Sequence, residues 1–214
     1  LVFIEKGGEI IPKIVDVEIT DRPLFSKPTV FLTNCPVCNT PLVKTEGEAA
    51  HYCPNSRGCA PQIKGKIEHF ISRKAMDIDG LGSETVVRLY NAGCIRNIAD
   101  IYDLTYKDFL KIEGFADKSI NNLLDGINAS RKVPFENVLF AIGIRNVGIT
   151  MAQNLARHFH KLQNLMNASY DQLTAVHEIG DKIAESIIAY FKDPKNNEII
   201  HRLMEKGLRF EVDF

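Results

Sequence analysis

The sequence predicts a mainly α-helical protein in three parts: a strand pair, a small cysteine-rich module and an all-α domain. Residues 1–19 alternate apolar and polar side chains, as two β-strands broken at a glycine pair would. Four cysteines lie between residues 35 and 59, in a window with few other core-forming side chains. From residue 76 onward apolar residues recur at helical spacing, in a pattern that repeats four times.

Length and composition narrow the class of protein. The chain has 214 residues, of which 45% are hydrophobic, so it can bury a core and form two or three folding units. It contains no apolar stretch of membrane-spanning length and opens on no signal peptide. We therefore expect a cytoplasmic protein with no membrane partner, where stable disulfides are rare. The net charge of −1 argues against a strongly basic nucleic-acid binder, although residues 27–74 are locally basic.

The strand pair looks incomplete. LVFIEKGGEIIPKIVDVEI predicts two strands joined by a turn at Gly7-Gly8. Two strands are not stable alone, so we expect the end of a β domain. Because the strand pattern starts at Leu1, we also expect the chain to be a piece of a longer protein. Residues 20–34 have no periodicity and are predicted to be a connector.

The cysteine window predicts a structural zinc site. The spacing is C-x2-C, fourteen residues, then C-x5-C. A C-x2-C turn lets two thiolates converge on one cation, and a second pair completes a tetrahedron that leaves no position open for substrate. Prolines and asparagines after the cysteines supply turn conformations. The predicted ligands are Cys35, Cys38, Cys53 and Cys59.

Three alternative readings of this window are weaker. A redox C-x2-C is expected at a helix start in a βαβ unit, a pattern that is missing around Cys35. Iron–sulfur clusters use other ligand spacings. His51 could replace a cysteine, but it fits a solvated strand residue better.

The second half of the chain contains a repeated nine-residue pattern. Its first, fourth and ninth positions are apolar, its fifth position is a small residue, and the other positions are free to vary. The copies are IDGLGSETV from Ile78, IEGFADKSI from Ile112, IRNVGITMA from Ile144 and VHEIGDKIA from Val176, at intervals of 34, 32 and 32 residues. Each copy leads into an amphipathic run, so each unit predicts a helix, a tight turn and a second helix. Tetratricopeptide and ankyrin repeats have similar periods, but their signature residues are missing.

Such a turn can bind an anion. Glycine leaves no side chain above the peptide groups, and the next helix presents free N–H groups and the positive end of its dipole. A phosphate fits this socket, and a backbone can be held there without base reading. The candidate phosphate-binding residues are Gly80, Gly82, Ser83, Gly114, Ala116, Lys118, Gly148, Thr150, Gly180 and Lys182.

The simpler alternative is that these glycines only form turns in a helical bundle. Four copies after a metal module favour phosphate binding, although single copies could be structural. Asn146 and Glu178 replace Gly80 and Gly114 in the third and fourth copies, and the Glu178 carboxylate would repel a phosphate. Ala116 replaces a turn glycine but leaves a helix start intact.

Taken in this order, these residues resemble the C-terminal half of a bacterial NAD-dependent DNA ligase. EKGGEIIPKI resembles the closing strands of that family's OB-fold domain, and the cysteine spacing resembles its four-cysteine zinc finger. IDGLGSETVVRLYNAG, FAIGIRNVG and the four repeats resemble its helix-hairpin-helix domain. The resemblance implies an OB-fold end and connector at 1–26, a zinc finger at 27–66 and a helix-hairpin-helix domain at 67–214.

The resemblance also implies a function. The whole enzyme uses NAD to adenylate a lysine of a K-x-D-G motif, passes AMP to the 5′-phosphate at a nick and seals the nick, with a divalent cation such as magnesium. The sequence here contains no K-x-D-G, so we expect no catalytic residue and no NAD site in this chain. We expect a monomer in which zinc fixes the architecture and the hairpins clamp double-stranded nicked DNA through its phosphates.

Two other functions remain as alternatives. A recombination-repair protein can pair a hairpin module with a four-cysteine zinc site, but by resemblance that family places the hairpin first. A helical scaffold that docks protein partners could carry the same turns.

Overall fold

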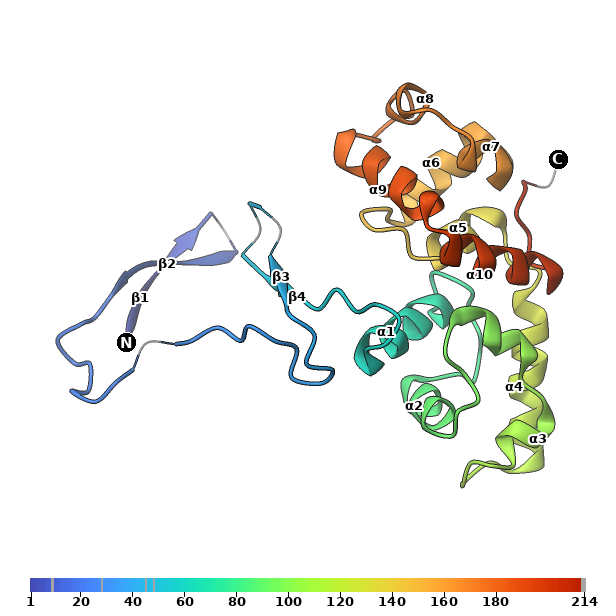
Figure 1. Cartoon of the computed structure of the whole chain (residues 1–214), viewed down its shortest axis with the longest axis horizontal. Helices are drawn as coiled ribbons and strands as arrows, with labels where there is room; N and C mark the ends of the chain where they lie inside the picture. Colours follow the sequence, from blue (N-terminus) through green and yellow to red (C-terminus); the bar gives the residue numbers. More distant parts are fainter. Residues whose placement is uncertain (9, 28, 45, 48, 213–214) are drawn as a thin grey trace.

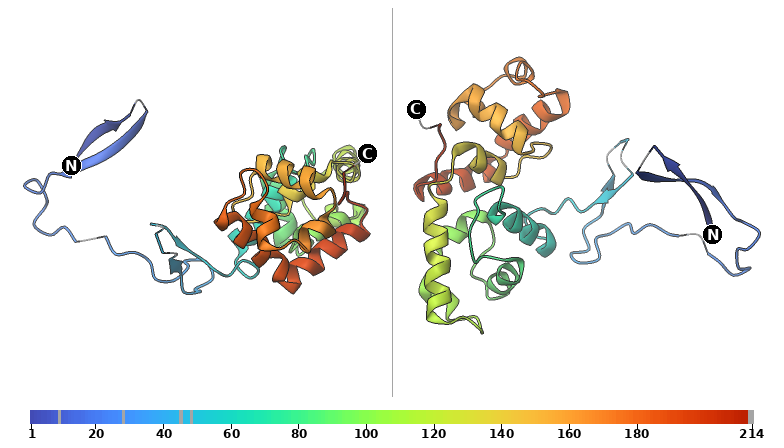
Figure 2. Two further views of the ribbon diagram at one scale, coloured as in Figure 1. Left: turned by 90° about the horizontal axis from the view of Figure 1, so that it is seen from above. Right: turned by 180° about the vertical axis from the view of Figure 1, so that it is seen from behind.

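The computed structural model describes residues 1–212 except 9, 28, 45 and 48. The described chain is mainly α-helical, which confirms the predicted fold class. A β-hairpin and the cysteine module extend from one side of a helical body, and Figures 1 and 2 show the hairpin apart from the helices in every view.

The N-terminal hairpin has the two predicted strands, β1 (Val2–Gly7) and β2 (Ile11–Val17). They pair antiparallel from Val2 opposite Val17 to Gly7 opposite Ile11, with a bulge between Phe3 and Ile4. Their apolar side chains are exposed on both faces. The connector that follows contains no helix or strand among its described residues, and its Pro28 lies outside them.

The cysteine module is small and leads directly into the first helix. Its strands β3 (Val43–Lys44) and β4 (His51–Tyr52) form an antiparallel pair. Helix α1 (Ala60–Ile71) begins immediately after Cys59, with Pro61 in its first turn. The boundary expected between residues 66 and 67 therefore falls inside α1, whose buried side chains belong to the helical core.

The helical body contains one 3₁₀ helix and nine α-helices after α1, counted over the described residues. They are α2 (Ser83–Asn91), η1 (Ile98–Asp103), α3 (Tyr106–Phe109), α4 (Asp117–Ser130), α5 (Phe135–Ala141), α6 (Ile149–Phe159), α7 (Leu162–Met166), α8 (Tyr170–Thr174), α9 (Asp181–Lys192) and α10 (Pro194–Glu205). Within residues 60–212 none of these helices is long and apolar enough to cross a membrane.

The four sequence repeats form four turns, each followed by a longer helix. Turn one (78–82) precedes α2, turn two (112–116) precedes α4, turn three (144–148) precedes α6 and turn four (176–180) precedes α9. The first and fourth residues of the pattern point into the core in every copy and are buried or half-buried. This burial explains the apolar spacing: it fixes each turn against the helix that follows.

The two halves of the body meet around α1 and α10. Helix α1 packs against α2, η1 and α5, while α10 packs against α9 and returns to η1. Figure 1 shows α1–α4 in the lower half and α5–α10 in the upper half. One continuous apolar core joins them, with Ile67, Phe70, Phe109 and Leu139 fully buried.

Candidate metal centre and nucleic-acid interface

The four cysteine sulfurs converge on one point. All four Sγ atoms lie within 4.8 Å of one another, with Cys35 and Cys59 3.9 Å apart and Cys38 and Cys53 3.5 Å apart. These separations are too long for disulfides, whose S–S bond is about 2.05 Å. Four thiolates about 2.3 Å from a tetrahedral zinc would be about 3.8 Å apart. The residues present therefore fit zinc.

The backbone around the cysteines is shaped for this convergence. Cys35 N–H donates to Thr40 carbonyl (2.8 Å), and Asn39 between them has a left-handed φ of 55°. At the other pair, the Asn55 side chain accepts from Gly58 N–H (2.8 Å). The last cysteine, Cys59, is also the residue that caps the start of α1, so the metal centre is joined rigidly to the helical body.

The surroundings shift the pKa values of Cys38 and Cys59 in opposite directions. Hydrogen bonds from Thr40, whose hydroxyl lies 3.2 Å from Cys38 Sγ, lower the pKa of Cys38 to about 6. Burial, followed by the neighbouring thiols, raises the pKa of Cys59 to about 12. A metal ion would be held by these cysteines as thiolates, so its binding would release their protons. His51 is exposed and stacks on Phe31, with ring centroids 5.6 Å apart, so it does not join the cluster.

The four turns share one backbone geometry. The third residue of each copy has a left-handed φ: 79° at Gly80, 87° at Gly114, 65° at Asn146 and 66° at Glu178. The fifth residue, Gly82, Ala116, Gly148 or Gly180, is the N-cap of the next helix, with φ between −93° and −80°. No side chain of the N-cap residue bonds to the first N–H groups of these helices. Those donors can therefore meet an anion.

The candidate phosphate-binding residues form four separate groups, one at each turn, and do not come together in a single cluster. Ser83, Lys118, Thr150 and Lys182 are exposed in the first turns of α2, α4, α6 and α9. Acidic residues also lie there: Glu84, Asp117 and Asp181 in α2, α4 and α9. Helix α6 has no acidic residue in its first turn, so turn three combines a free helix start with the least negative surroundings.

The turns pair in two sets through residues that the sequence analysis missed. Arg88 on α2 donates to the Glu113 carbonyl in turn two (3.1 Å). Asn154 on α6 donates to the His177 carbonyl in turn four (3.3 Å). Both donors stand ten residues after the start of their repeat, so aligning the repeats beyond nine positions would have found them.

The reciprocal contacts complete each pair. Asn146 in turn three donates to Ser186 Oγ on α9 (3.1 Å), and Ser186 again stands ten residues into its repeat. Turn one packs against α4, where Gly126 comes so close that an added Cβ would lie 2.8 Å from the Asp79 carbonyl oxygen. Turns one and two thus form one hairpin pair, and turns three and four form a second.

The cysteine module contacts the second pair. Arg57 of the C-x5-C loop forms an ion pair with Asp193 (2.5 Å) and a hydrogen bond with Asn196 (3.0 Å), at the junction of α9 and α10. Arg145 in turn three lies over the ring of Tyr52, 5.3 Å from its centroid. The predicted metal centre is therefore positioned against turn three and the end of α9.

Sequence comparisons agree with this division. Residues 34–60 match the NAD-dependent DNA ligase C4 zinc finger domain, residues 72–129 a SAM-like helix-hairpin-helix tandem, and residues 137–200 a helix-hairpin-helix motif. The two helix-hairpin-helix matches coincide with the two hairpin pairs.

Curated relatives match over almost the whole chain. The DNA ligase of Cytophaga hutchinsonii is 54% identical over 211 residues, and that of Flavobacterium psychrophilum is 51% identical over 211; both alignments cover 99% of this chain and 32% of the relative. The DNA ligase of Phocaeicola vulgatus is 53% identical over 213 residues, again 32% of its length. This chain thus spans about a third of the length of these relatives, and it belongs to the NAD-dependent DNA ligase family, of which it holds the zinc-finger and helix-hairpin-helix part.

Proposed function

We propose that this chain clamps nicked double-stranded DNA through sequence-independent contacts to the phosphate backbone, within a DNA ligase that seals the nick. The observation that carries the proposal is the shared geometry of the four turns, each with a helix start left free for an anion. The proposed contacts are those given above for Gly80, Gly82, Ser83, Gly114, Ala116, Lys118, Gly148, Thr150, Gly180 and Lys182.

The turns are not equal in this proposal. Turn three has no acid in the first turn of its helix, whereas Glu178 places a carboxylate in turn four. In turns two and four, the first-turn aspartates Asp117 and Asp181 accept hydrogen bonds from Tyr106 and Tyr170. Those bonds hold the carboxylates aside but leave their charge in place. We therefore assign the strongest phosphate contact to turn three.

We also propose that zinc, held by Cys35, Cys38, Cys53 and Cys59, is structural. The four sulfurs fill a tetrahedral shell, so no position is left for a reacting group. Catalysis, NAD and a divalent cation such as magnesium then belong to parts of the enzyme outside this chain. We propose that the boundary between the zinc finger and the helical domain lies after Cys59 and not after residue 66, because α1 packs in the helical core. A cytoplasmic monomer remains our prediction.

The decisive experiment places a side chain over the helix starts without disturbing the fold. A Cβ at Gly82 meets nothing within 4 Å, and at Gly148 only the Met151 sulfur, at 3.6 Å. Both residues have φ values that valine accepts. The double variant Gly82→Val/Gly148→Val should therefore stay folded and lose DNA affinity by at least about tenfold, or about 1.4 kcal/mol.

Affinity for nicked and intact duplexes of unrelated sequence is measured by fluorescence anisotropy over a salt series. Wild-type affinity should fall as salt rises and should not depend on base sequence. Asn121→Val, on the exposed surface of α4, is the control for added bulk. A folded double variant with full affinity would support a protein-docking scaffold and overturn the clamp.

A further inference from the structure

A cavity of about 700 Å³ opens where three parts of the molecule meet, and Ile144 and Val147 of turn three belong to its lining. The loop before Cys59, helix α1, the segment before η1, the end of α5 and the α9–α10 junction all contribute to its wall. None of the residues proposed to bind phosphate in the four turns lines it. Ligand pockets favour such junctions, and this volume is that of a site for a small molecule.

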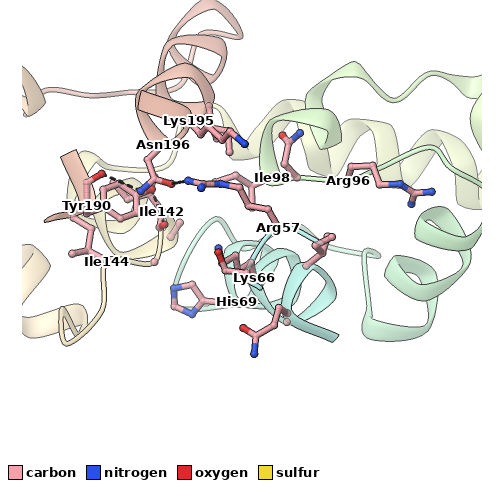
Figure 3. A pocket seen from close by; sticks show the side chains of 18 of the residues that line it. Arg57, Lys66, His69, Arg96, Ile98, Ile142, Ile144, Tyr190, Lys195 and Asn196 are labelled. Carbon is pink, nitrogen blue, oxygen red and sulfur yellow. Dashed lines mark hydrogen bonds between the residues drawn. The ribbon is translucent and has the colours of Figure 1, made fainter. Parts of the chain in front are cut away.

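The floor of the cavity is apolar. Ile63, Ile98, Ile142 and Ile144 line it and are each less than a tenth exposed, so they present the edge of the hydrophobic core to the cavity. Figure 3 shows Ile98, Ile142 and Ile144 around it. A flat apolar group could cover this floor and remove its exposed surface from water, which favours binding.

The rim carries an excess of positive charge. Its lining includes Arg57, Lys66, Arg96, Lys195 and Arg202, together with one acidic residue, Glu198.

Two of these cations are already neutralised. Arg57 is paired with Asp193, and Arg202 is paired with Asp100 (2.9 Å) and Asp103 (2.7 Å).

Lys66, Arg96 and Lys195 have no carboxylate at ion-pair distance among the residues that the structure describes. Arg96 is held over the Tyr90 ring, 4.3 Å from its centroid. In Figure 3, Arg57 lies between Lys195 on one side and Lys66 on the other. Both lysines line the same cavity.

Lys66 carries an electrostatic strain that an anion would relieve. Burial and then the nearby Arg57 guanidinium lower the pKa of Lys66, and Asp193 offsets this only in part. A negative group beside the ammonium would restore a favourable environment for its charge.

We propose that this cavity binds a small amphipathic anion: a planar ring system on the isoleucine floor, with one phosphate or carboxylate between Lys66 and Lys195. A nucleoside monophosphate has this chemistry and this size. Because the wall includes the loop of the cysteine module and both hairpin pairs, the bound molecule ties these three parts together. The cavity borders turn three, but the proposed anion position at Lys66 and Lys195 uses none of the residues proposed to bind DNA phosphates.

Isothermal titration of the zinc-loaded chain with AMP tests the proposal. AMP should bind at least about tenfold more tightly than adenosine, which lacks the anion, and than inorganic phosphate, which lacks the ring. Methyl resonances of Ile63, Ile98 and Ile142 should shift on titration. Equal binding of AMP and inorganic phosphate would mean charge attraction alone and would overturn the site.

Two variants locate the anion. Lys66→Glu/Lys195→Glu should lower AMP affinity at least about tenfold. The milder Lys66→Gln/Lys195→Gln should lower AMP affinity by less, and it replaces the first variant if charge reversal impairs folding. Lys107 is an exposed lysine on α3 outside the cavity, so Lys107→Glu should leave AMP affinity unchanged.

The turns provide the competing location. AMP binding that survives the lysine variants but disappears in Gly82→Val/Gly148→Val would place the phosphate at the turns and overturn the proposal. Retained AMP binding in the glycine variant supports it.

Discussion

Single residues in the turns show how far a fold can override local preference. Each turn needs a left-handed residue at its third position, and the first two copies supply glycine. Asn146 tolerates this conformation because its short polar side chain can form local hydrogen bonds. Glu178 is strained in it, because its Cβ crowds the neighbouring carbonyl at positive φ. The turn keeps its shape because Val176 and Ile179 are buried and Ile179 N–H bonds to the Val176 carbonyl (3.0 Å).

Glu178→Gly should stabilise the protein by about 0.5–1 kcal/mol, since relief of the strained φ exceeds the greater entropy of the unfolded chain. Removing the Glu178 side chain loses only one long hydrogen bond, in which Asn154 Nδ2 donates to the Glu178 carboxylate at 3.4 Å. Urea denaturation measures the free energy of unfolding. The same variant should bind duplex DNA more tightly, because it removes a carboxylate from turn four.

Glu178→Gln separates the two effects. It keeps the strained backbone but removes the charge, so it should raise DNA affinity without raising stability. If glycine and glutamine changed stability equally, the left-handed residue would not be a source of strain.

At the scale of elements, the hairpins are held in pairs by side chains that bond to the partner turn. Arg88→Met and Asn154→Leu each remove a donor to a backbone carbonyl and should each cost about 0.5–1.5 kcal/mol. The two residues lie in different pairs and share no partner, so the losses should add within about 0.5 kcal/mol.

Asn122→Leu is the matched control. Asn122 likewise stands ten residues after the start of its repeat, but among the described residues its side chain forms no hydrogen bond with turn one. It should leave the free energy of unfolding almost unchanged. Strong coupling between Arg88→Met and Asn154→Leu would contradict two separate pairs.

The cysteine module is an element whose stability should depend on the metal. Among the described residues of 27–59, only Cys35 and Cys59 are buried, so the module has almost no core of its own. Removing zinc with a chelator should abolish protection of the Cys35 and Leu42 amides in hydrogen exchange. The helical body has a separate core and should keep its far-ultraviolet circular dichroism.

A small effect should still reach the helices. Losing the module also loses the ion pair of Arg57 with Asp193, whose side chains are 40% and 34% exposed, so the loss of stability should be small. Arg57→Met should reproduce that small loss while keeping zinc bound. Complete helix unfolding at one equivalent of chelator would contradict the separate cores.

How much of this could be predicted from the sequence depends on the distance between partners. The β1–β2 hairpin, the cysteine spacing and the four turns are set by residues close in sequence, and all were predicted as elements. The pairing of Arg57 with Asp193 joins residues 136 apart, and no local pattern marks it. Helix α10 was not predicted, and neither was its return to η1, because packing against distant segments decides both.

At the scale of the whole molecule, the two hairpin pairs are joined by one charged network on α10. Arg202 bonds to Asp100 and Asp103 of η1, and Lys206 also bonds to Asp103. These residues connect the last helix of the second pair with the 3₁₀ helix of the first. The network therefore helps to hold the two hairpin pairs in a fixed arrangement relative to one another.

Arg202→Met keeps most of the side-chain length and removes the charge, so Asp103 keeps Lys206 as an ion-pair partner whereas Asp100 loses its contact with Arg202. The free energy of unfolding should fall by about 1–2 kcal/mol, since the Asp100 and Arg202 side chains are only 19% and 33% exposed. For a chain of this size, each kcal/mol of lost stability should lower the melting temperature by about 2–4 °C. Arg73→Met, at an exposed arginine with no ion pair among the described residues, is the control.

The effect should depend on pH in a defined direction. Lys206 and then Arg202 hold the pKa of Asp103 below its ordinary value, so its contribution to stability is complete above that value, about 3.9, and is lost as the pH falls through the lowered one. The difference between wild type and Arg202→Met should therefore be constant from about pH 5 to 8 and shrink in acid. Urea titrations of both proteins at each pH measure it. A difference that stayed constant into acid would show that Arg202 acts through packing and not through its charge, because a packing contribution does not titrate.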